Sequence, residues 1–155
     1  MLKALLLAIV LIKPPLIPPE ILCVRTVDGD TIVVEDDAGK RTSVRLLGID
    51  APETKHPTKG VQPYGPEASA HVRRLLTGRR VRLVDDTASG ERDRYGRRLA
   101  WVFLDDACVN EELVSLGLAR AYTEFRVDPV MEVKLQLLER KAREAKRGLW
   151  SLDPD

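Results

Sequence analysis

The sequence predicts an α+β protein built on a five-stranded β-barrel with three helices. The order of its patterns predicts this class. Three short β-type runs come before the first helical pattern, and two more runs follow it before two further helical patterns. The length of 155 residues, with 44% hydrophobic residues, suits one ordinary domain with a single core.

The first three strands are expected near the start of the folded region. Ile21–Val27 and Thr31–Val34 are β-type runs separated by Asp28 and Gly29, which form a strong tight-turn signal. A second turn leads into the third run, Thr42–Leu47. Because only short turns join these runs, we expect an antiparallel meander.

A helix and two more strands are expected next. The helix begins at Pro66, a residue favoured at the first helical position, and stops at Gly78. Val81–Val84 and Leu99–Leu104 are the fourth and fifth strands, separated by a charged loop. A five-stranded barrel with a helix between strands three and four describes an OB-fold.

Two helices are expected to complete the domain. Asn110–Leu116 is a short helix, and Pro129–Arg147 is a longer one that Gly148 ends. The longer helix is expected to bury a stripe of Val130, Val133, Leu137, Leu138, Ala142 and Ala145.

Residues 1–19 are expected to be a leader with a Pro-rich spacer, and residues 20–152 the folded domain. An apolar run follows Lys3 and resembles a signal-peptide core, although it is too short to span a bilayer. Two interpretations stay open: the run directs secretion or membrane anchoring, or it is an N-terminal extension of a cytoplasmic protein.

The composition excludes several classes of protein. The net charge of +1 does not indicate a globally basic nucleic-acid binder. Arginines do gather between residues 71 and 98, which leaves a local basic face or an ordinary solvated surface open. Cys23 and Cys108 have no metal-ligand spacing, which excludes a zinc finger and a disulfide scaffold and favours buried thiols. A bridge between these two cysteines stays open for an exported protein.

Polar residues suited to metal and phosphate binding sit where the predicted strands begin and end. Asp30 opens the second strand, and Asp50 and Glu53 follow the third. Convergent carboxylates repel each other and need a cation, and an all-oxygen ligand set favours Ca²⁺ or Mg²⁺. Arg45 and Arg97 are placed to hold a phosphate beside that cation.

Four motifs occur in order: VDGDT at 27–31, RLLGIDAPETKHP at 45–57, YGPEASA at 64–70 and DRYGR at 93–97. With them the chain resembles the staphylococcal nuclease family over residues 21–150. The resemblance implies an OB-fold hydrolase, a monomeric endonuclease that uses Ca²⁺. Its expected substrates are single-stranded or frayed DNA and RNA, cut between phosphorus and the 5′ oxygen to leave 3′-phosphate ends.

The resemblance also implies roles for single residues. Asp30, Asp50 and the backbone carbonyl of Ala51 would be metal ligands; Arg45, Glu53 and Arg97 would be catalytic; Arg94, Tyr95 and Tyr122 would bind substrate. Glu53 would orient or deprotonate the attacking water, and the two catalytic arginines would hold the scissile phosphate. Lys59, in the irregular loop, is either a further nucleic-acid contact or an ordinary solvated lysine.

The chain departs from the family pattern near one contact region. The resemblance leads us to expect two tyrosines around residues 121–125, but Tyr122 is displaced by one position and Phe125 replaces the second tyrosine. The contacts to base and sugar are therefore not implied by the resemblance. The alternative function is a catalytically silent OB-fold that only binds nucleic acid, although such a module would have no need of the complete polar set.

Overall fold

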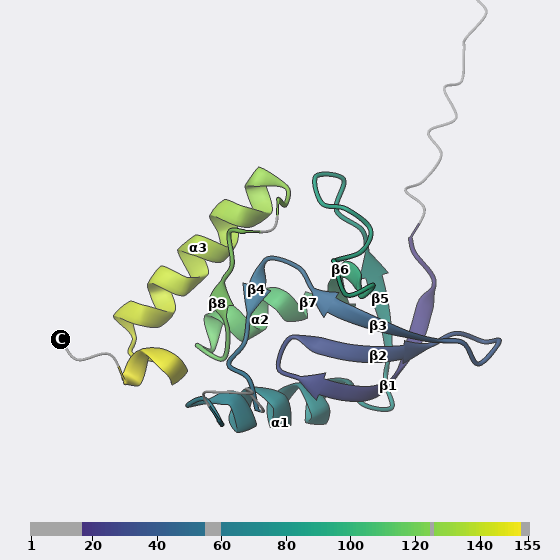
Figure 1. Cartoon of the computed structure of the whole chain (residues 1–155). Helices are drawn as coiled ribbons and strands as arrows, with labels where there is room; N and C mark the ends of the chain where they lie inside the picture. The colour runs from purple at the N-terminus through teal and green to yellow at the C-terminus, as the bar shows by residue number, and fades with distance from the viewer. Residues whose placement is uncertain (1–16, 55–59, 125, 153–155) are drawn as a thin grey trace, which may run out of the picture.

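The structure is a computed structural model that describes residues 17–54, 60–124 and 126–152 (Figure 1). The expected leader, except for residues 17–19, and the candidate Lys59 lie outside the described residues. Cys23 is buried and Cys108 is partly buried, and both are free thiols.

Five strands form a closed barrel, which confirms the predicted fold. They are β1 (Glu20–Asp28), β2 (Thr31–Glu35), β3 (Arg41–Leu46), β5 (Arg80–Val84) and β6 (Arg98–Leu104). Their order in the sheet is β3-β2-β1-β5-β6, and a parallel pairing of β3 with β6 closes the barrel. The first three strands form the expected antiparallel meander.

Short strand pairings that the sequence did not predict are added to the barrel. β4 (Ile49–Asp50) pairs antiparallel with β8 (Arg120–Ala121) in a separate two-stranded sheet. β7 (Ala107–Cys108) pairs with the end of β6. Two-residue strands are too short to show a period, so only their tertiary partners reveal them. Figure 1 shows β4 and β8 between α1 and α3, at one end of the barrel.

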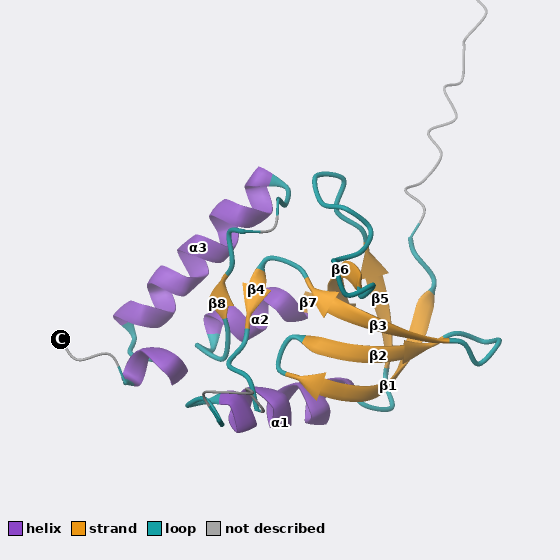
Figure 2. Cartoon of the chain, viewed as in Figure 1, coloured by secondary structure: helices purple, strands orange, loops and turns teal. Residues whose placement is uncertain are grey.

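Three α-helices and a short 3-10 helix, η1 (Gly148–Ser151), lie beside the barrel in the described part of the chain (Figure 2). The α-helices are α1 (Gly65–Leu76), α2 (Val109–Ser115) and α3 (Pro129–Glu144). The Asp128 carboxylate caps α3 by accepting hydrogen bonds from the backbone N–H groups of its first turn. None of these helices is long and apolar enough to cross a membrane.

The predicted buried stripe of α3 was wrong for most of its residues. Val130 and Val133 are 74% and 64% exposed, and Leu137 and Ala145 are also exposed. The face turned toward the protein carries Met131, Leu135, Leu138 and Ala142 instead. The helix contains two overlapping apolar stripes of helical period, and packing against α2 and β8 selects between them.

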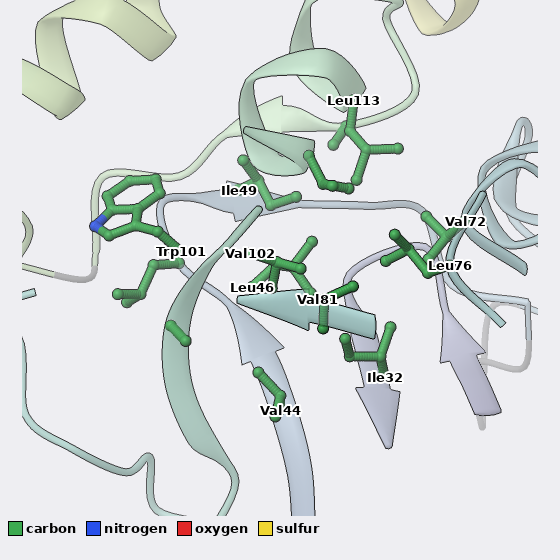
Figure 3. Close-up of a cluster of buried hydrophobic side chains, with 14 of the residues drawn as sticks. Ile32, Val44, Leu46, Ile49, Val72, Leu76, Val81, Trp101, Val102 and Leu113 are labelled. Carbon is green, nitrogen blue, oxygen red and sulfur yellow. The ribbon is translucent and has the colours of Figure 1, made fainter. Parts of the chain in front are cut away.

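The core fills the space between the barrel and the helices (Figure 3). Its fully buried side chains come from several elements, among them Ile32, Val44, Leu46, Val72, Leu76, Val102 and Leu113. Asn110 is also fully buried; its amide accepts from Val102 N–H and donates to the Leu47 carbonyl. Both polar atoms of the buried Asn110 amide therefore have hydrogen-bond partners. One of these partners, the Leu47 carbonyl, directly follows the end of β3.

A buried carboxylate joins the loop after β5 to the start of α3. Asp86 accepts hydrogen bonds from Trp101 Nε1 at 2.9 Å, from Asp128 N–H at 2.9 Å and from Ala88 N–H at 2.8 Å. Burial raises the pKa of Asp86, but these donors outweigh burial, so the pKa lies below its usual value. The ionised carboxylate therefore stabilises the fold.

Candidate active site

A pocket of about 510 Å³ lies at the rim of the barrel, beside the β1–β2 turn and β4. It is lined by Asp28, Asp30, Thr31, Arg45, Asp50, Ala51, Glu53, Arg92, Asp93, Arg94, Tyr95, Arg97, Leu99, Tyr122 and Glu124. The pocket brings together all the site residues predicted from the sequence except Lys59, which is outside the described residues. Their roles remain predictions, but their common location is a property of the fold.

Arg45 lies at the base of this pocket and is only 5% exposed. Its NH1 donates to the carbonyls of Leu46 at 3.0 Å and Ile49 at 2.8 Å. Its NH2 lies 3.2 Å from Asp30 Oδ2 and 3.1 Å from Asp50 Oδ1. The guanidinium is therefore fixed by the chain on one side and by two carboxylates on the other.

Asp30 and Asp50 converge as expected, although they belong to different elements. Asp30 lies in the tight turn before β2, where its Oδ2 accepts from Ala51 N–H at 2.9 Å and its Oδ1 from the Thr31 hydroxyl. Burial and the nearby carboxylates of Asp30 and Glu53 raise the pKa of Asp50, more than the Arg45 guanidinium lowers it. A cation placed between these carboxylates would relieve that repulsion.

The turn that carries Asp30 depends on a glycine. A Cβ on Gly29 would lie 2.8 Å from the Cβ atoms of both Ala51 and Ala68. No larger residue fits there without a shift of the chain, because real Cβ atoms do not approach so closely. Gly29 thus lets the β1–β2 turn approach both the segment after β4 and helix α1.

The backbone of Glu53 is held while its side chain is exposed to the pocket. Its N–H donates to Gln62 Oε1 at 2.9 Å, and its carbonyl accepts from Gln62 N–H. A Cβ on Gly65 would lie 2.7 Å from the same carbonyl oxygen, so the start of α1 also packs closely on this segment. A fixed backbone and a solvent-accessible carboxylate suit a group that must reach a bound water.

Asp93 organises the loop that carries Arg97. Its Oδ1 accepts from the backbone N–H groups of Tyr95 and Arg97, and its Oδ2 accepts from Arg97 Nε at 2.6 Å. Burial raises the pKa of Asp93, but the hydrogen bonds from Arg97 and Tyr95 lower it by more, so the pKa lies below its usual value. Arg97 NH1 reaches the Thr31 hydroxyl at 3.3 Å, which brings the loop to the start of β2.

Arg94 and Tyr95 lie on the outer side of the same loop. Arg94 NH2 donates to the Tyr95 hydroxyl at 2.7 Å, and the guanidiniums of Arg94 and Arg97 lie 4.8 and 5.3 Å from the Tyr95 ring centroid. The Tyr95 side chain is exposed at the edge of the pocket. This arrangement presents two positive charges at the outer wall of the pocket.

The pocket also contains residues for which the sequence predicted no role, among them Asp28, Arg92 and Glu124. Asp28 Oδ1 accepts from the Thr54 hydroxyl at 2.6 Å, and Arg92 NH1 donates to the Gly96 carbonyl at 2.7 Å. Glu124 accepts from the Tyr122 hydroxyl at 2.7 Å. Asp28 and Arg92 stand inside or beside the recognised motifs and were open to prediction, whereas no pattern marks Glu124.

The oxygen donors of the pocket fit a hard divalent cation. Within the described ranges no three side chains of His, Cys, Asp or Glu gather closely enough to hold a metal by themselves. Asp30 and Asp50 supply two carboxylates, and Ala51 adjoins Asp30 through its N–H. Ca²⁺ takes carboxylate, carbonyl and water oxygens together, so two carboxylates can be the protein's side-chain share of such a site.

Fold and site together define a class of protein: an α+β domain on an OB-fold barrel, with arginines and carboxylates facing one pocket at the barrel rim. Residues 43–152 match the family model described as staphylococcal nuclease homologue. The chain belongs to the staphylococcal nuclease family.

Curated relatives agree with this assignment. The chain is 43% identical to a thermonuclease of Staphylococcus hyicus over 128 residues, which cover 83% of this chain and 73% of the relative. It is 39% identical to endonuclease YncB of Bacillus subtilis over 82% of this chain and 59% of the relative. It is 40% identical to an uncharacterized endonuclease of Escherichia coli O157:H7 over 83% of this chain and 74% of the relative.

Proposed function

We propose that this protein is a calcium-dependent nuclease that hydrolyses DNA and RNA and leaves 3′-phosphate ends. One observation carries the proposal: a single pocket holds two convergent aspartates, an exposed glutamate and two anchored arginines. Relatives named thermonuclease and endonuclease support a nuclease activity. We further propose that the protein acts as a monomer on single-stranded or frayed nucleic acid.

Asp30, Asp50 and the Ala51 carbonyl are the proposed calcium ligands. Bound Ca²⁺ would supply positive charge for the phosphate oxygens and make a neighbouring water easier to deprotonate. Both aspartates lie close to the same Arg45 nitrogen, at 3.1 and 3.2 Å. Two carboxylates this close together carry negative charge that a bound cation would compensate, which supports a calcium site here. The all-oxygen donor set favours a hard cation.

The arginines are proposed to stabilise the charge that builds up during hydrolysis. Attack of water on a phosphodiester increases the negative charge on the phosphate's equatorial oxygens, and donors fixed in advance stabilise it most. The carbonyls of Leu46 and Ile49 fix Arg45, and Asp93 fixes Arg97. Both guanidiniums are thus held in the pocket before a phosphate binds.

Glu53 is the proposed general base. Its carboxylate is exposed to the pocket, and its backbone is held by Gln62. In the proposed step the carboxylate accepts a proton from the attacking water, the water oxygen bonds to phosphorus, and the P–O5′ bond breaks. The leaving 5′ oxygen takes up a proton, so the products are a 3′-phosphate and a 5′-hydroxyl.

Tyr95 and Arg94 are the proposed contacts to a neighbouring phosphate, and Tyr122 is a proposed substrate contact at the opposite wall. The exposure of Tyr95 and its two guanidinium neighbours support binding of an anionic group there. The hydrogen bond of Tyr122 to Glu124 indicates that any contact through its hydroxyl is shared with that carboxylate.

Calcium titration of an Asp50→Asn variant tests the metal site apart from catalysis. Asp37→Asn is the matched control, because Asp37 lies in the β2–β3 turn and pairs only with Arg80 among the described residues. We expect calorimetry to show calcium binding about tenfold weaker or worse for Asp50→Asn, and unchanged for the control. Equal affinity in both variants would remove Asp50 from the calcium site.

Digestion of single-stranded DNA, with calcium and then with a calcium chelator, tests the activity. The proposal predicts cleavage with calcium only. If the folded protein binds the DNA without cutting it in calcium, the silent binding module is the correct function.

A further inference from the structure

A second pocket of about 410 Å³ adjoins the active-site pocket on the far side of Asp50. Asp50 lines both pockets, so a ligand that leaves the first pocket past this residue enters the second. The volume falls within the range of roughly 300–1,000 Å³ that is usual for small-molecule sites. The residues of this second pocket other than Asp50 and Gln62 have no part in the function proposed above.

Arg120 is the cation of this second pocket. It is the partner of Asp50 in the β4–β8 pairing, so the two residues lie directly opposite each other at the boundary between the pockets. Its guanidinium stacks at 4.5 Å from the ring centroid of the buried Trp150. Among the described residues Arg120 forms no ion pair, and its charge acts on the Asp50 carboxylate at longer range. The guanidinium can therefore also attract an anion that enters the second pocket.

The other residues that line the second pocket are apolar, except for the side-chain amide of Gln62. Pro52, Pro63 and Leu152 present flat or aliphatic surfaces, and Leu152 is more than half exposed. Gln62 is fixed because its Oε1 accepts from Glu53 N–H, and its amide NH₂ offers two donors. An arginine beside apolar walls and one amide suits a nucleotide, which has one anionic group and a flat base.

We propose that this pocket binds the nucleotide next to the scissile phosphate, with Arg120 on its backbone phosphate and its base against the proline and leucine walls. The inference rests on the proposed nuclease function, since it extends the same strand from one pocket to the next. Contact with a base face is tolerant of sequence, so the pocket extends the bound strand without selecting a base.

Two substrates of different length test the assignment. A dinucleoside monophosphate contains the scissile phosphate but lacks the phosphate that Arg120 would contact, whereas a single-stranded hexanucleotide contains it. Steady-state cleavage in calcium is measured for the full-length wild type, for Arg120→Gln, and for Arg140→Gln as control. Arg140 is exposed on α3 and lines neither pocket.

We expect Arg120→Gln to raise KM for the hexanucleotide about tenfold, and to lower the salt dependence of log KM by about 0.7. Its kcat and its KM for the dinucleoside monophosphate should stay close to wild type, as should all values for Arg140→Gln. Leu152→Glu, at an exposed site on the apolar wall of the same pocket, should also raise KM for the hexanucleotide.

An equal loss on both substrates, with unchanged salt dependence, would show that Arg120 only supports the fold through Trp150. An unchanged KM for the hexanucleotide in both Arg120→Gln and Leu152→Glu would also overturn the inference while leaving the nuclease function intact. Failure of the wild type to cleave either substrate would overturn the proposed function, and this inference with it.

Discussion

Replacement of Arg45 by lysine keeps a positive charge at the base of the pocket but removes the two-nitrogen fork. In the wild type, NH1 binds the carbonyls of Leu46 and Ile49 while NH2 lies between the two aspartates. A single ammonium nitrogen cannot occupy both positions. The loss of two hydrogen bonds, each contributing about 1 kcal/mol, should lower the free energy of unfolding by about 2 kcal/mol.

The effect of Arg45→Lys on catalysis should be larger than its effect on stability. Loss of one prearranged donor to the transition state lowers turnover by about 10² to 10³. The assays are urea unfolding and hydrolysis of single-stranded DNA at saturating calcium and substrate. Arg41→Lys is the control, because Arg41 is on the same strand with its side chain 69% exposed. Turnover of Arg45→Lys within threefold of wild type would refute the reasoning.

Three further substitutions test separate parts of the structure. Glu53→Gln should retain the fold and lower turnover by about 10² in the same hydrolysis assay, because it removes the proposed general base; near-normal turnover would exclude that role. Gly29→Ala should lower the unfolding free energy by about 1–3 kcal/mol in urea titrations, because its Cβ would overlap those of Ala51 and Ala68; a wild-type midpoint would contradict this. Asp86→Asn should be less stable than wild type at neutral pH. Because the pKa of Asp86 is lowered in the fold, its stabilisation is present above the usual carboxyl pKa and is lost as pH falls through the lowered value, so the difference between the two proteins should shrink toward low pH. A difference that does not depend on pH would contradict this assignment.

The barrel was predictable because its strands carry local signals. Alternating apolar residues and turn residues mark β1 to β3, and proline and glycine mark the limits of α1. The pairing of β4 with β8 depends on contacts between segments about 70 residues apart, and a two-residue strand has no detectable period. The register of α3 was missed because either of two apolar stripes satisfies a helical period, and only packing distinguishes them.

The candidate site was predictable where a residue type and its strand position agreed. Asp30 and Asp50 were expected at one rim, and the structure places both beside the same nitrogen of Arg45. The burial of Arg45 and its bonds to backbone carbonyls were not predictable, because they depend on how the chain turns after β3. Glu124 was missed because it lies in an irregular segment without a period or a motif.

Analysis of the ends produced from a single-stranded oligonucleotide tests the central claim most directly. The full-length protein is incubated with the oligonucleotide in calcium, and the masses of the fragments are measured by mass spectrometry. We predict fragments with 3′-phosphate and 5′-hydroxyl ends, which appear in calcium and not in the presence of a calcium chelator. Fragments with 5′-phosphate ends would contradict the proposed direction of bond cleavage, and an intact oligonucleotide would contradict the nuclease function itself.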